Sequence, residues 1–361
     1  MSREAAVSDL SREIVAFIER GRPDEALFNQ LALAVFAYQH EWNAPYRRFC
    51  DGRDAGPGSV THWSEIPPAP AAAFKRFALT SAPEADCEPK RGGRIFHSSG
   101  TTGSETSRHF LDATALGVYR ASLKAGYRRF VPNPPVETLA FMPPVAEAPN
   151  SSLSFMLDAL GATFHWEESP GDTDWITRVG HELQNRSEQV TLFGTAFAWV
   201  HFFDAIPDRF SLPGGSVAIE TGGFKGRSRE VSRDELYELF QERLGIPASH
   251  CLSEYGMSEM TSQFYDSSLV DHLAGRSRPA RKVAPFWLKT RIFDPVTAKE
   301  ALPGVPGLLA HYDLANLNSV LAIQTEDLGQ ATEDAEGFVL LGRAPGAILR
   351  GCSLTAEDRM G

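Results

Sequence analysis

Short apolar segments that alternate with helical patterns constrain the fold of this chain most. Segments 139–142, 190–193 and 216–219 are apolar enough to be buried strands, and the last two precede glycine-containing breaks. Segment 233–244 follows them with the apolar spacing of an amphipathic helix. Buried strands that alternate with helices are typical of parallel sheets built from strand–helix–strand units. The sequence therefore predicts an α/β fold.

Helical and β-rich segments are predicted on either side of this core. Apolar residues recur every three or four positions in four further segments, which predicts helices over 8–20, 23–40, 114–129 and 151–160. Residues 51–70 are rich in Gly and Pro and are expected to form an extended connection. Beyond residue 284 the pattern changes to strands and turns, with strands expected at 287–293, 307–312, 320–324 and 337–341.

Length, charge and cysteine content limit the possible functions. A chain of 361 residues can form one large α/β domain with subdomains. Its net charge of −11 argues against nucleic acid as the main partner, since phosphate contacts need a basic face. The four cysteines show no metal-ligand spacing and suit free thiols in a reducing compartment. Without a signal-peptide pattern or an apolar stretch that could span a bilayer, the sequence predicts a cytoplasmic protein.

A hydroxyl- and glycine-rich segment follows a predicted strand at 93–97. Its glycines allow successive backbone N–H groups to converge on an anion, and its hydroxyls add donors for phosphate oxygens. The GxxxxGK[ST] pattern of a Walker loop occurs nowhere in the chain. The segment is a candidate loop for the β- and γ-phosphates of ATP, although such clusters also form plain surface turns. Its residues are Ser98, Ser99, Gly100, Thr101, Thr102 and Gly103.

Two further segments carry residues suited to a nucleotide. A strand that ends in Gly222 and Gly223 lets the backbone lie against a flat ring, and Lys225 follows as a cation that could face phosphates. Either feature could instead belong to a simple solvated turn. Segment 252–259 offers a tyrosine, a glycine turn, a hydroxyl and a carboxylate. Its candidates are Tyr255 for stacking on a base, Gly256 and Ser258 for the α-phosphate, and Glu259 for Mg²⁺.

The last candidate pair lies near the end of the chain. Asp327 stands at a predicted strand end, where a carboxylate accepts hydrogen bonds from ribose hydroxyls in dinucleotide folds. Arg343 closes the following glycine-rich strand. A turn between two hairpin strands would account for Asp327 equally well.

These four segments, in this order, resemble those of the adenylate-forming superfamily of acyl-CoA synthetases, luciferases and peptide-synthetase adenylation domains. The resemblance implies the large N-terminal domain of that superfamily, with layered α/β sheets and a more β-rich C-terminal portion. It also implies ATP and Mg²⁺ as cofactors. By the same resemblance, the loop at 98–103 binds pyrophosphate, the glycine pair lies by adenine, and Asp327 and Arg343 bind ribose.

Two departures from the superfamily pattern stand out. The lysine usual soon after the loop is missing, and Arg108 is the nearest cation, so Arg108 is predicted to replace it. The chain ends at Gly361, and no lysine follows Lys299, so the small C-terminal domain with its catalytic lysine is expected to be absent. The expected organisation is an adenylation domain over 1–345, helical over about 1–75, and a tail over 346–361.

One subfamily fits both departures. The whole chain resembles the acyl-protein synthetase (LuxE-like) family through SSGTTG…SRHFLD, PNSSLSFM, TGGFKGRSRE and the terminal LRGCSL. N-terminal matches include Tyr38-Gln39 and Trp63. The resemblance implies that a fatty acid is adenylated, carried as a thioester on Cys352, and passed to an NADPH-dependent acyl reductase or another acceptor protein. Cysteine thiolate is a suitable nucleophile for a mixed anhydride.

The leading hypothesis is therefore an ATP-dependent acyl-protein synthetase, with Cys352, Arg108 and Lys225 as catalytic candidates. A second reading keeps the adenylation and passes the acyl group to coenzyme A or a carrier protein, without Cys352. A third is a non-catalytic nucleotide-binding subunit. Phe155, Phe197 and Met257 are candidates for lining an acyl pocket, although each could equally be a core residue.

Overall fold

The computed structural model describes residues 2–98, 106–167, 174–222 and 231–345. Its contacts divide the chain into two compact units. Unit 1 comprises Met1–Gly126, Gly256–Gln263 and Val283–Gly361. Unit 2 comprises Tyr127–Tyr255 and Phe264–Lys282.

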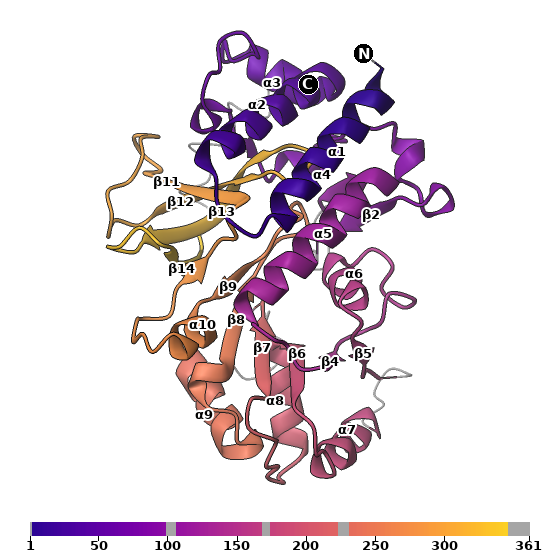
Figure 1. Cartoon of the computed structure of the whole chain (residues 1–361), viewed down its shortest axis with the longest axis vertical. Coiled ribbons are helices and arrows are strands. Elements are labelled where there is room, and N and C mark those ends of the chain that lie inside the picture. The colour runs from indigo at the N-terminus through magenta and orange to yellow at the C-terminus, as the bar shows by residue number, and fades with distance from the viewer. Residues whose placement is uncertain (1, 99–105, 168–173, 223–230, 346–361) are drawn as a thin grey trace. The chain divides into compact units, whose positions relative to one another are not determined.

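Unit 2 is built on a mostly parallel sheet. Its strands lie side by side in the order β9-β8-β7-β6-β4-β5, and only β9 runs antiparallel to its neighbour (Figure 1). The strands are β4 (Glu137–Phe141), β5 (Thr163–Phe164), β6 (Val190–Thr195), β7 (Val217–Thr221), β8 (Cys251–Tyr255) and β9 (Phe264–Asp266). The helices are α6 (Ser152–Ala159), α7 (Asp174–Gln184), α8 (Ala196–Ala205), α9 (Arg233–Leu244) and α10 (Ser268–Leu273).

Strand β6 shows how closely helix and sheet approach in unit 2. The sequence predicts that this strand ends before Gly194, but it continues through Gly194 to Thr195. A Cβ at Gly194 would lie 3.1 Å from Nε1 of Trp199, which donates to the Ile219 carbonyl at 3.3 Å. The glycine therefore makes room for a fully buried indole of α8 and does not mark a break in the strand.

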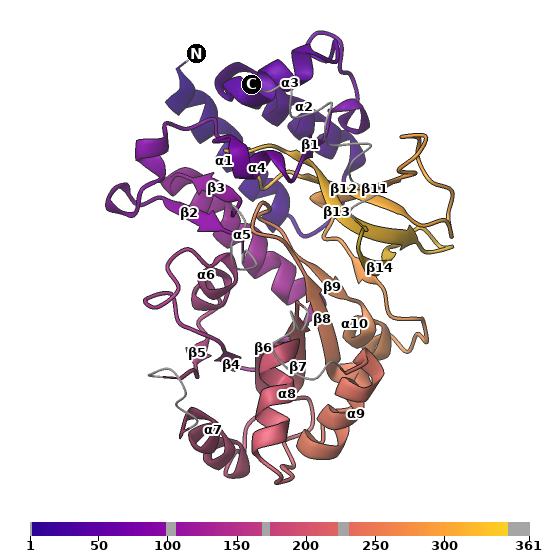
Figure 2. The ribbon, with the colours of Figure 1, turned by 180° about the vertical axis from the view of Figure 1, so that it is seen from behind.

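Unit 1 contains an antiparallel sheet, a separate hairpin and the N-terminal helices (Figure 2). The sheet has the order β11-β12-β13-β14, and β1 pairs with β13 in parallel. The strands are β1 (Ala69–Pro70), β2 (Arg94–His97), β3 (Arg108–Leu111), β11 (Leu288–Phe293), β12 (Gly307–Asp313), β13 (Ala322–Ala331) and β14 (Phe338–Arg343). The helices are α1 (Arg3–Glu19), α2 (Glu25–Trp42), α3 (Ala44–Asp51) and α4 (Ala73–Arg76).

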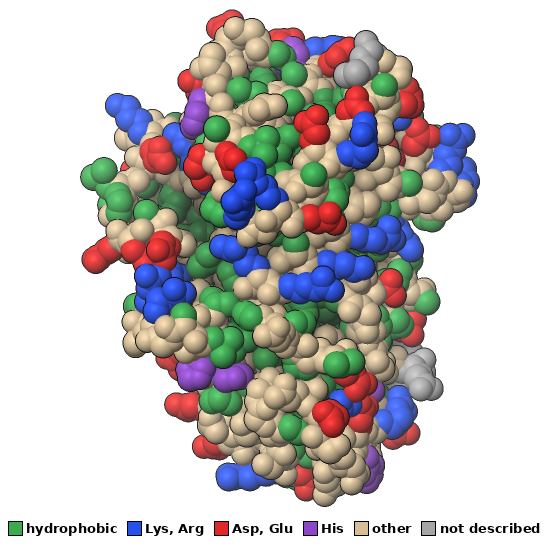
Figure 3. Space-filling model, in the orientation of Figure 1, with side chains coloured by type: hydrophobic (Ala, Val, Ile, Leu, Met, Phe, Trp, Pro, Cys, Tyr) green, Lys and Arg blue, Asp and Glu red, His purple; other side chains and the backbone are tan. Residues whose placement is uncertain are grey.

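Two elements have residues in both units, namely α5 (Ala113–Phe130) and β10 (Lys282–Val283). Helix α5 buries Leu116 and Leu123, whereas Arg120, Lys124 and Arg128 recur every four residues on its exposed face. Figure 3 shows Lys and Arg side chains gathered over this helix. This helix is therefore locally basic in a chain of net charge −11.

The α/β class and the β-rich C-terminal portion are confirmed. The structure has every predicted helix and strand; most ends shift by one to three residues, but α1 begins five residues earlier and β13 ends seven residues later than predicted. Capping residues fix several helix starts: Asp24 accepts from the Leu27 N–H, and Ser151 accepts from the Ser154 N–H. The expected connection at 51–70 also contains a short 3₁₀ helix, Trp63–Glu65, and strand β1.

The remaining elements are additions that the pattern did not predict. They include α3, α7, α8, β3 and β8. Strand β3 changes the setting of the candidate phosphate loop, since it pairs antiparallel with β2 in the register His97↔Arg108. The loop therefore connects the two strands of a hairpin. Within the described residues, no helix combines the length and the low polarity needed to cross a bilayer.

Candidate active site

Two serines pair at the loop end of the β2–β3 hairpin, just beyond the last strand pair. The Ser98 N–H donates to the Ser107 carbonyl at 3.2 Å, and the Ser107 N–H donates to the Ser98 hydroxyl oxygen at 3.0 Å. This pairing fixes the two ends of the candidate phosphate loop. Arg108 follows directly on β3, with its guanidinium 5.5 Å from the centre of the Phe110 ring.

The segment after Tyr255 lies against this hairpin. The Ser258 hydroxyl donates to the His97 carbonyl at 3.3 Å, which brings two predicted motifs of unit 1 together. Glu259 follows and is only 7% exposed. Burial raises the pKa of the Glu259 carboxyl, while the neighbouring Ser107 hydroxyl and the charge of Arg343 act to lower it. A nearby cation would favour the ionised form of this carboxyl.

A buried amide holds the Glu259 backbone in place. The Asn316 side-chain NH₂ donates to the carbonyls of Glu259 and Val320, both at 2.9 Å. Its oxygen lies 2.9 Å from Nε2 of His109 on β3. Burial lowers the pKa of His109 to about 4, so the neutral ring donates from Nε2 to the amide. One side chain thus links the hairpin, the Glu259 segment and the β12–β13 connection.

The β12–β13 connection is itself buried and polar. Gln39 of α2 donates to the carbonyls of Asn316 and Leu317 at 2.8 and 3.0 Å, and accepts from the Leu321 N–H at 2.7 Å. Asp313 accepts from the Ser262 hydroxyl at 2.7 Å and from the Thr261 N–H at 3.0 Å. These bonds satisfy groups that burial would otherwise leave unpaired, which makes the connection a rigid support for the Glu259 segment.

Asp327 and Arg343 lie opposite each other in the β13–β14 pair. Nε of Arg343 is 3.7 Å from Oδ1 of Asp327, and its NH1 is 2.8 Å from Oε2 of Glu326. The Arg343 side chain is 74% exposed, so these ion pairs are weak and the guanidinium can reorient toward a ligand. The predicted ribose pair is therefore adjacent, and Glu326 is an additional carboxylate beside it.

In unit 2, two predicted residues end neighbouring parallel strands. Gly222 follows β7 with φ +68°, a conformation that favours glycine, and Tyr255 ends β8. The register Thr221↔Glu254 places the strand ends side by side, and the Thr221 hydroxyl donates to the Glu254 carboxyl. Burial raises the pKa of Glu254 to about 7. Ligands of parallel sheets bind at this carboxyl edge.

A buried ionic cluster binds the backbone of β8 two residues before its end. Lys282 donates to the Ser253 carbonyl at 2.7 Å and lies 3.3 Å from Oδ1 of Asp266. Asp266 also pairs with Arg233 and accepts from the Ser253 N–H at 3.0 Å. Asp266 is fully buried, and these partners compensate the cost of removing its charge from water.

Several predicted site residues lie outside the described residues, and their roles stay predictions. They are Ser99, Gly100, Thr101, Thr102, Gly103, Gly223, Lys225 and Cys352. The described candidates fall into two groups. Ser98, Arg108, Gly256, Ser258, Glu259, Asp327 and Arg343 belong to unit 1, whereas Gly222 and Tyr255 belong to unit 2.

The residues of unit 1 could bind Mg²⁺ only together with phosphate oxygens of a substrate. In the described part of the chain, no three His, Cys, Asp or Glu side chains gather as a metal site. Glu259 supplies a hard carboxylate oxygen, and Mg²⁺ in proteins is often held by one carboxylate together with phosphate oxygens and water. The donor set therefore suits a metal bound together with a nucleotide.

Sequence reasoning missed the residues that hold the Glu259 segment, namely His109, Asp313 and Asn316. The run from Asp313 to Leu321 mixes polar and apolar residues without a regular period, yet no residue in it is more than 1% exposed. Gln39 was noted only through the family resemblance. A polar residue in a helical face that is otherwise apolar is the one signal that could have marked it.

Solved structures with a similar fold include a CoA ligase and an ATP-bound protein. A 2-hydroxyisobutyryl-CoA ligase solved with 2-HIB-AMP and CoA matches with a TM-score of 0.64 at 14% identity, over 90% of this chain and 72% of that one. The chain has the fold of this ligase. The ATP-bound MatB of Rhodopseudomonas palustris matches with a TM-score of 0.51 at 19% identity, over 80% of this chain.

The match covers only 54% of MatB, so the chain spans about half the length of that enzyme. No family model and no curated protein matches this chain. At these identities the likeness shows the fold alone. The activity must therefore be argued from the residues of the site.

Proposed function

We propose that this protein activates a carboxylic acid with ATP, forming an acyl-adenylate and pyrophosphate, and then transfers the acyl group to a thiol. The observation that carries the proposal is the arrangement in unit 1. Ser98 and Ser107 pair where the hairpin meets its loop, and Ser258 donates to the His97 carbonyl beside them. The buried Glu259 follows Ser258, and the charge of Arg343 acts to lower its pKa. Arg343 in turn pairs with Asp327. A phosphate loop, a metal-binding carboxylate and a ribose acceptor are the parts that such a reaction needs.

In the first step, a carboxylate oxygen of the acid attacks the α-phosphorus of ATP and pyrophosphate leaves. No general base is required, because a carboxylic acid is already ionised near neutral pH. The work of the protein is to orient the reactants and to neutralise charge on the phosphates. The loop at 98–103 would hold the pyrophosphate, with Arg108 and Lys225 as cations. Gly222, Tyr255, Gly256, Asp327 and Arg343 would hold the nucleoside and α-phosphate.

Magnesium would be held by Glu259 together with phosphate oxygens. When bound, it neutralises phosphate charge that would repel the attacking carboxylate. The buried position of Glu259 is suited to this role, because its ionised form is costly without a cation nearby.

In the second step, a thiolate attacks the acyl carbon and AMP leaves. Cys50, Cys87 and Cys251 are buried, and burial raises the pKa of each thiol. Such thiols are poor nucleophiles, which supports Cys352 as the acyl carrier. The Cys352 thioester and the NADPH-dependent acyl reductase are the finer part of the proposal and depend on the family resemblance. The resemblance also implies a fatty acid, whereas the small aromatic cavity described below favours a shorter, aromatic acid.

Acid-dependent exchange of labelled pyrophosphate into ATP tests the first step. We expect exchange with at least one acid of a panel and none without acid. Arg108→Ala should reduce exchange by at least about tenfold if Arg108 replaces the missing lysine. Arg12→Ala, an exposed arginine of α1, is the matched control. Equal exchange by the two variants would rule out the assigned role of Arg108.

Transfer to coenzyme A is the alternative for the second step, and CoA in the 2-hydroxyisobutyryl-CoA ligase structure favours it. Radiolabelled acid should label the protein, neutral hydroxylamine should release the label, and Cys352→Ser should abolish labelling. Label that appears on CoA at the same rate in Cys352→Ser would instead identify CoA as the acceptor.

A further inference from the structure

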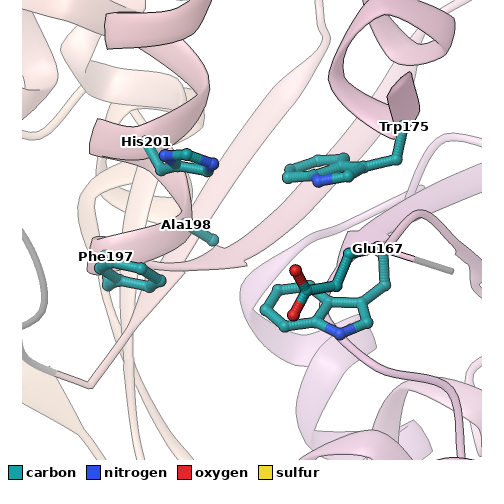
Figure 4. A pocket seen from close by; sticks show the side chains of 6 residues that line it. Glu167, Trp175, Phe197, Ala198 and His201 are labelled. Atoms are coloured by element: carbon teal, nitrogen blue, oxygen red, sulfur yellow. The ribbon is translucent and has the colours of Figure 1, made fainter. Parts of the chain in front are cut away.

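A cavity of about 200 Å³ lies at the carboxyl edge of the parallel sheet in unit 2. Its lining is aromatic apart from one carboxylate and one small residue. The lining residues are Trp166, Glu167, Trp175, Phe197, Ala198 and His201. Figure 4 shows Phe197 and His201 projecting from α8 toward Trp175 and Glu167 on the opposite side.

The strand order accounts for the position of the cavity. Trp166 and Glu167 follow β5, while Phe197, Ala198 and His201 belong to the helix that follows β6. Strands β5 and β6 flank β4, so the cavity lies beside the end of β4. There Phe141 packs against Trp175 and Trp199, with ring centres 6.0 and 4.8 Å apart. The wall is thus anchored in the core of the unit.

Two of the four rings of the wall are nearly parallel, and the other two are tilted. Phe197 and His201 are one helical turn apart, with planes only 4° from parallel and centres 6.1 Å apart. Trp175 is tilted by 38° from His201 and by 31° from Trp166, at 6.5 and 6.3 Å. Trp175 is buried and His201 is exposed, so the lining extends from the core of unit 2 to its surface. Aromatic side chains on several sides of a small cavity favour a flat, apolar occupant.

The same sheet edge carries predicted nucleotide-binding residues. Thr195 caps α8 and is the register partner of Thr221, which immediately precedes Gly222. Only β7 separates β6 from β8, whose last residue is Tyr255. The end of β4, where the cavity lies, is two strands along the same edge from the end of β7. An acid activated beside Gly222 and Tyr255 could therefore extend its tail along the edge toward this cavity.

We propose that this cavity binds the tail of the acid substrate and that the tail is an aromatic ring. The inference rests on the proposed adenylation. The cavity is smaller than typical ligand pockets of roughly 300–1,000 Å³, which suits a single ring better than a long alkyl chain. The Glu167 carboxylate also disfavours an acid with a second carboxylate at its far end.

Pyrophosphate exchange with three acids, 3-phenylpropanoate, octanoate and hexadecanoate, tests this assignment. We expect kcat/KM for 3-phenylpropanoate to exceed that for hexadecanoate by at least about tenfold. Ala198→Leu, which fills the cavity, should raise KM for 3-phenylpropanoate by about tenfold and leave KM for ATP unchanged. Ala205→Leu adds the same side chain at an exposed position of α8 and should change neither value.

His201→Ala provides a second variant, because truncation of an exposed side chain leaves the fold intact. It should weaken 3-phenylpropanoate binding, measured by equilibrium dialysis without ATP, and leave ATP binding unchanged. A preference for hexadecanoate, or unchanged phenylpropanoate kinetics in Ala198→Leu and His201→Ala, would overturn the assignment while exchange continues. Cavity-dependent binding of the ring without any exchange would instead refute the proposed adenylation.

Discussion

At the scale of single residues, Asn316 contributes most to the geometry of the candidate site. Its amide donates to two carbonyls, accepts from His109, and is fully buried. Each of these groups would lose its partner if the amide were removed. A buried polar group without a partner costs roughly 1–3 kcal/mol.

Asn316→Ala should therefore lower the free energy of unfolding by about 2–4 kcal/mol and reduce pyrophosphate exchange. The control is Asn185→Ala, which removes one exposed amide bond to the His181 carbonyl and should change stability by less than about 0.5 kcal/mol. Urea denaturation of the two variants measures the difference. Equal stabilities would show that Asn316 is not a structural link.

Glu259→Gln should separate the role of Glu259 in the reaction from its role in folding. The amide keeps the shape of the side chain and removes a buried carboxyl with a raised pKa, so the variant should be no less stable than the native protein. Exchange should fall by about 100-fold. A rise in the magnesium concentration needed for half-maximal rate would accompany the fall. Native exchange rates in the variant would exclude Glu259 as a metal ligand.

At the scale of elements, the pairing of β7 and β8 depends on pH through Glu254. Its folded pKa of about 7 lies above the ordinary value of 4.5 for a glutamate, so folding favours the protonated form. Its contribution to stability is full below pH 4.5 and is lost as the pH rises through 7. Glu254→Gln should therefore be more stable than the native protein at pH 8, by on the order of 2–3 kcal/mol.

The advantage of Glu254→Gln should shrink toward zero at pH 5, where the native carboxyl is protonated. Urea denaturation at the two pH values measures it. Glu238→Gln, on the exposed face of α9, is the control and should show little difference at either pH. A constant difference between pH 5 and pH 8 would contradict the raised pKa.

Two glycine substitutions should have opposite effects because their surroundings differ. Gly194→Ala on β6 places a Cβ 3.1 Å from Trp199 and should destabilise the protein by about 1–3 kcal/mol. Gly117→Ala on α5 meets nothing within 4 Å and should stabilise it by about 0.5–1 kcal/mol. Thermal unfolding of both variants provides the measurement. Effects of the same sign would show that the packing around Gly194 is looser than described.

Elements whose apolar residues recur with a clear period were predictable from the sequence. Elements that depend on tertiary contacts were not. Helix α9 was predicted with its exact ends, because Ser232 caps one end and Gly245 ends the other in a left-handed conformation. Strand β3 was missed because Arg108 and His109 make it look polar. His109 is in fact buried against Asn316, more than 200 residues away in sequence. No local pattern carries that information.

At the scale of the whole molecule, the order of the motifs predicted the fold class. The buried residues that hold the Glu259 segment in place were found only in the structure. The predicted residues Ser98, Ser258 and Glu259 are neighbours in unit 1. The connection beneath them was not predicted, because its polar side chains and carbonyls are paired with residues distant in sequence. The aromatic cavity was foreseen only through Phe197, because its other walls come from separate strand ends.

The proposed function depends on attack by a carboxylate oxygen of the substrate on the α-phosphorus of ATP. An active acid labelled with ¹⁸O in both carboxylate oxygens tests it directly, with hydroxylamine as acceptor and mass spectrometry of the released AMP. We expect that each AMP carries one ¹⁸O and that pyrophosphate carries none. Label in inorganic phosphate or pyrophosphate, or unlabelled AMP formed together with the hydroxamate, would contradict it.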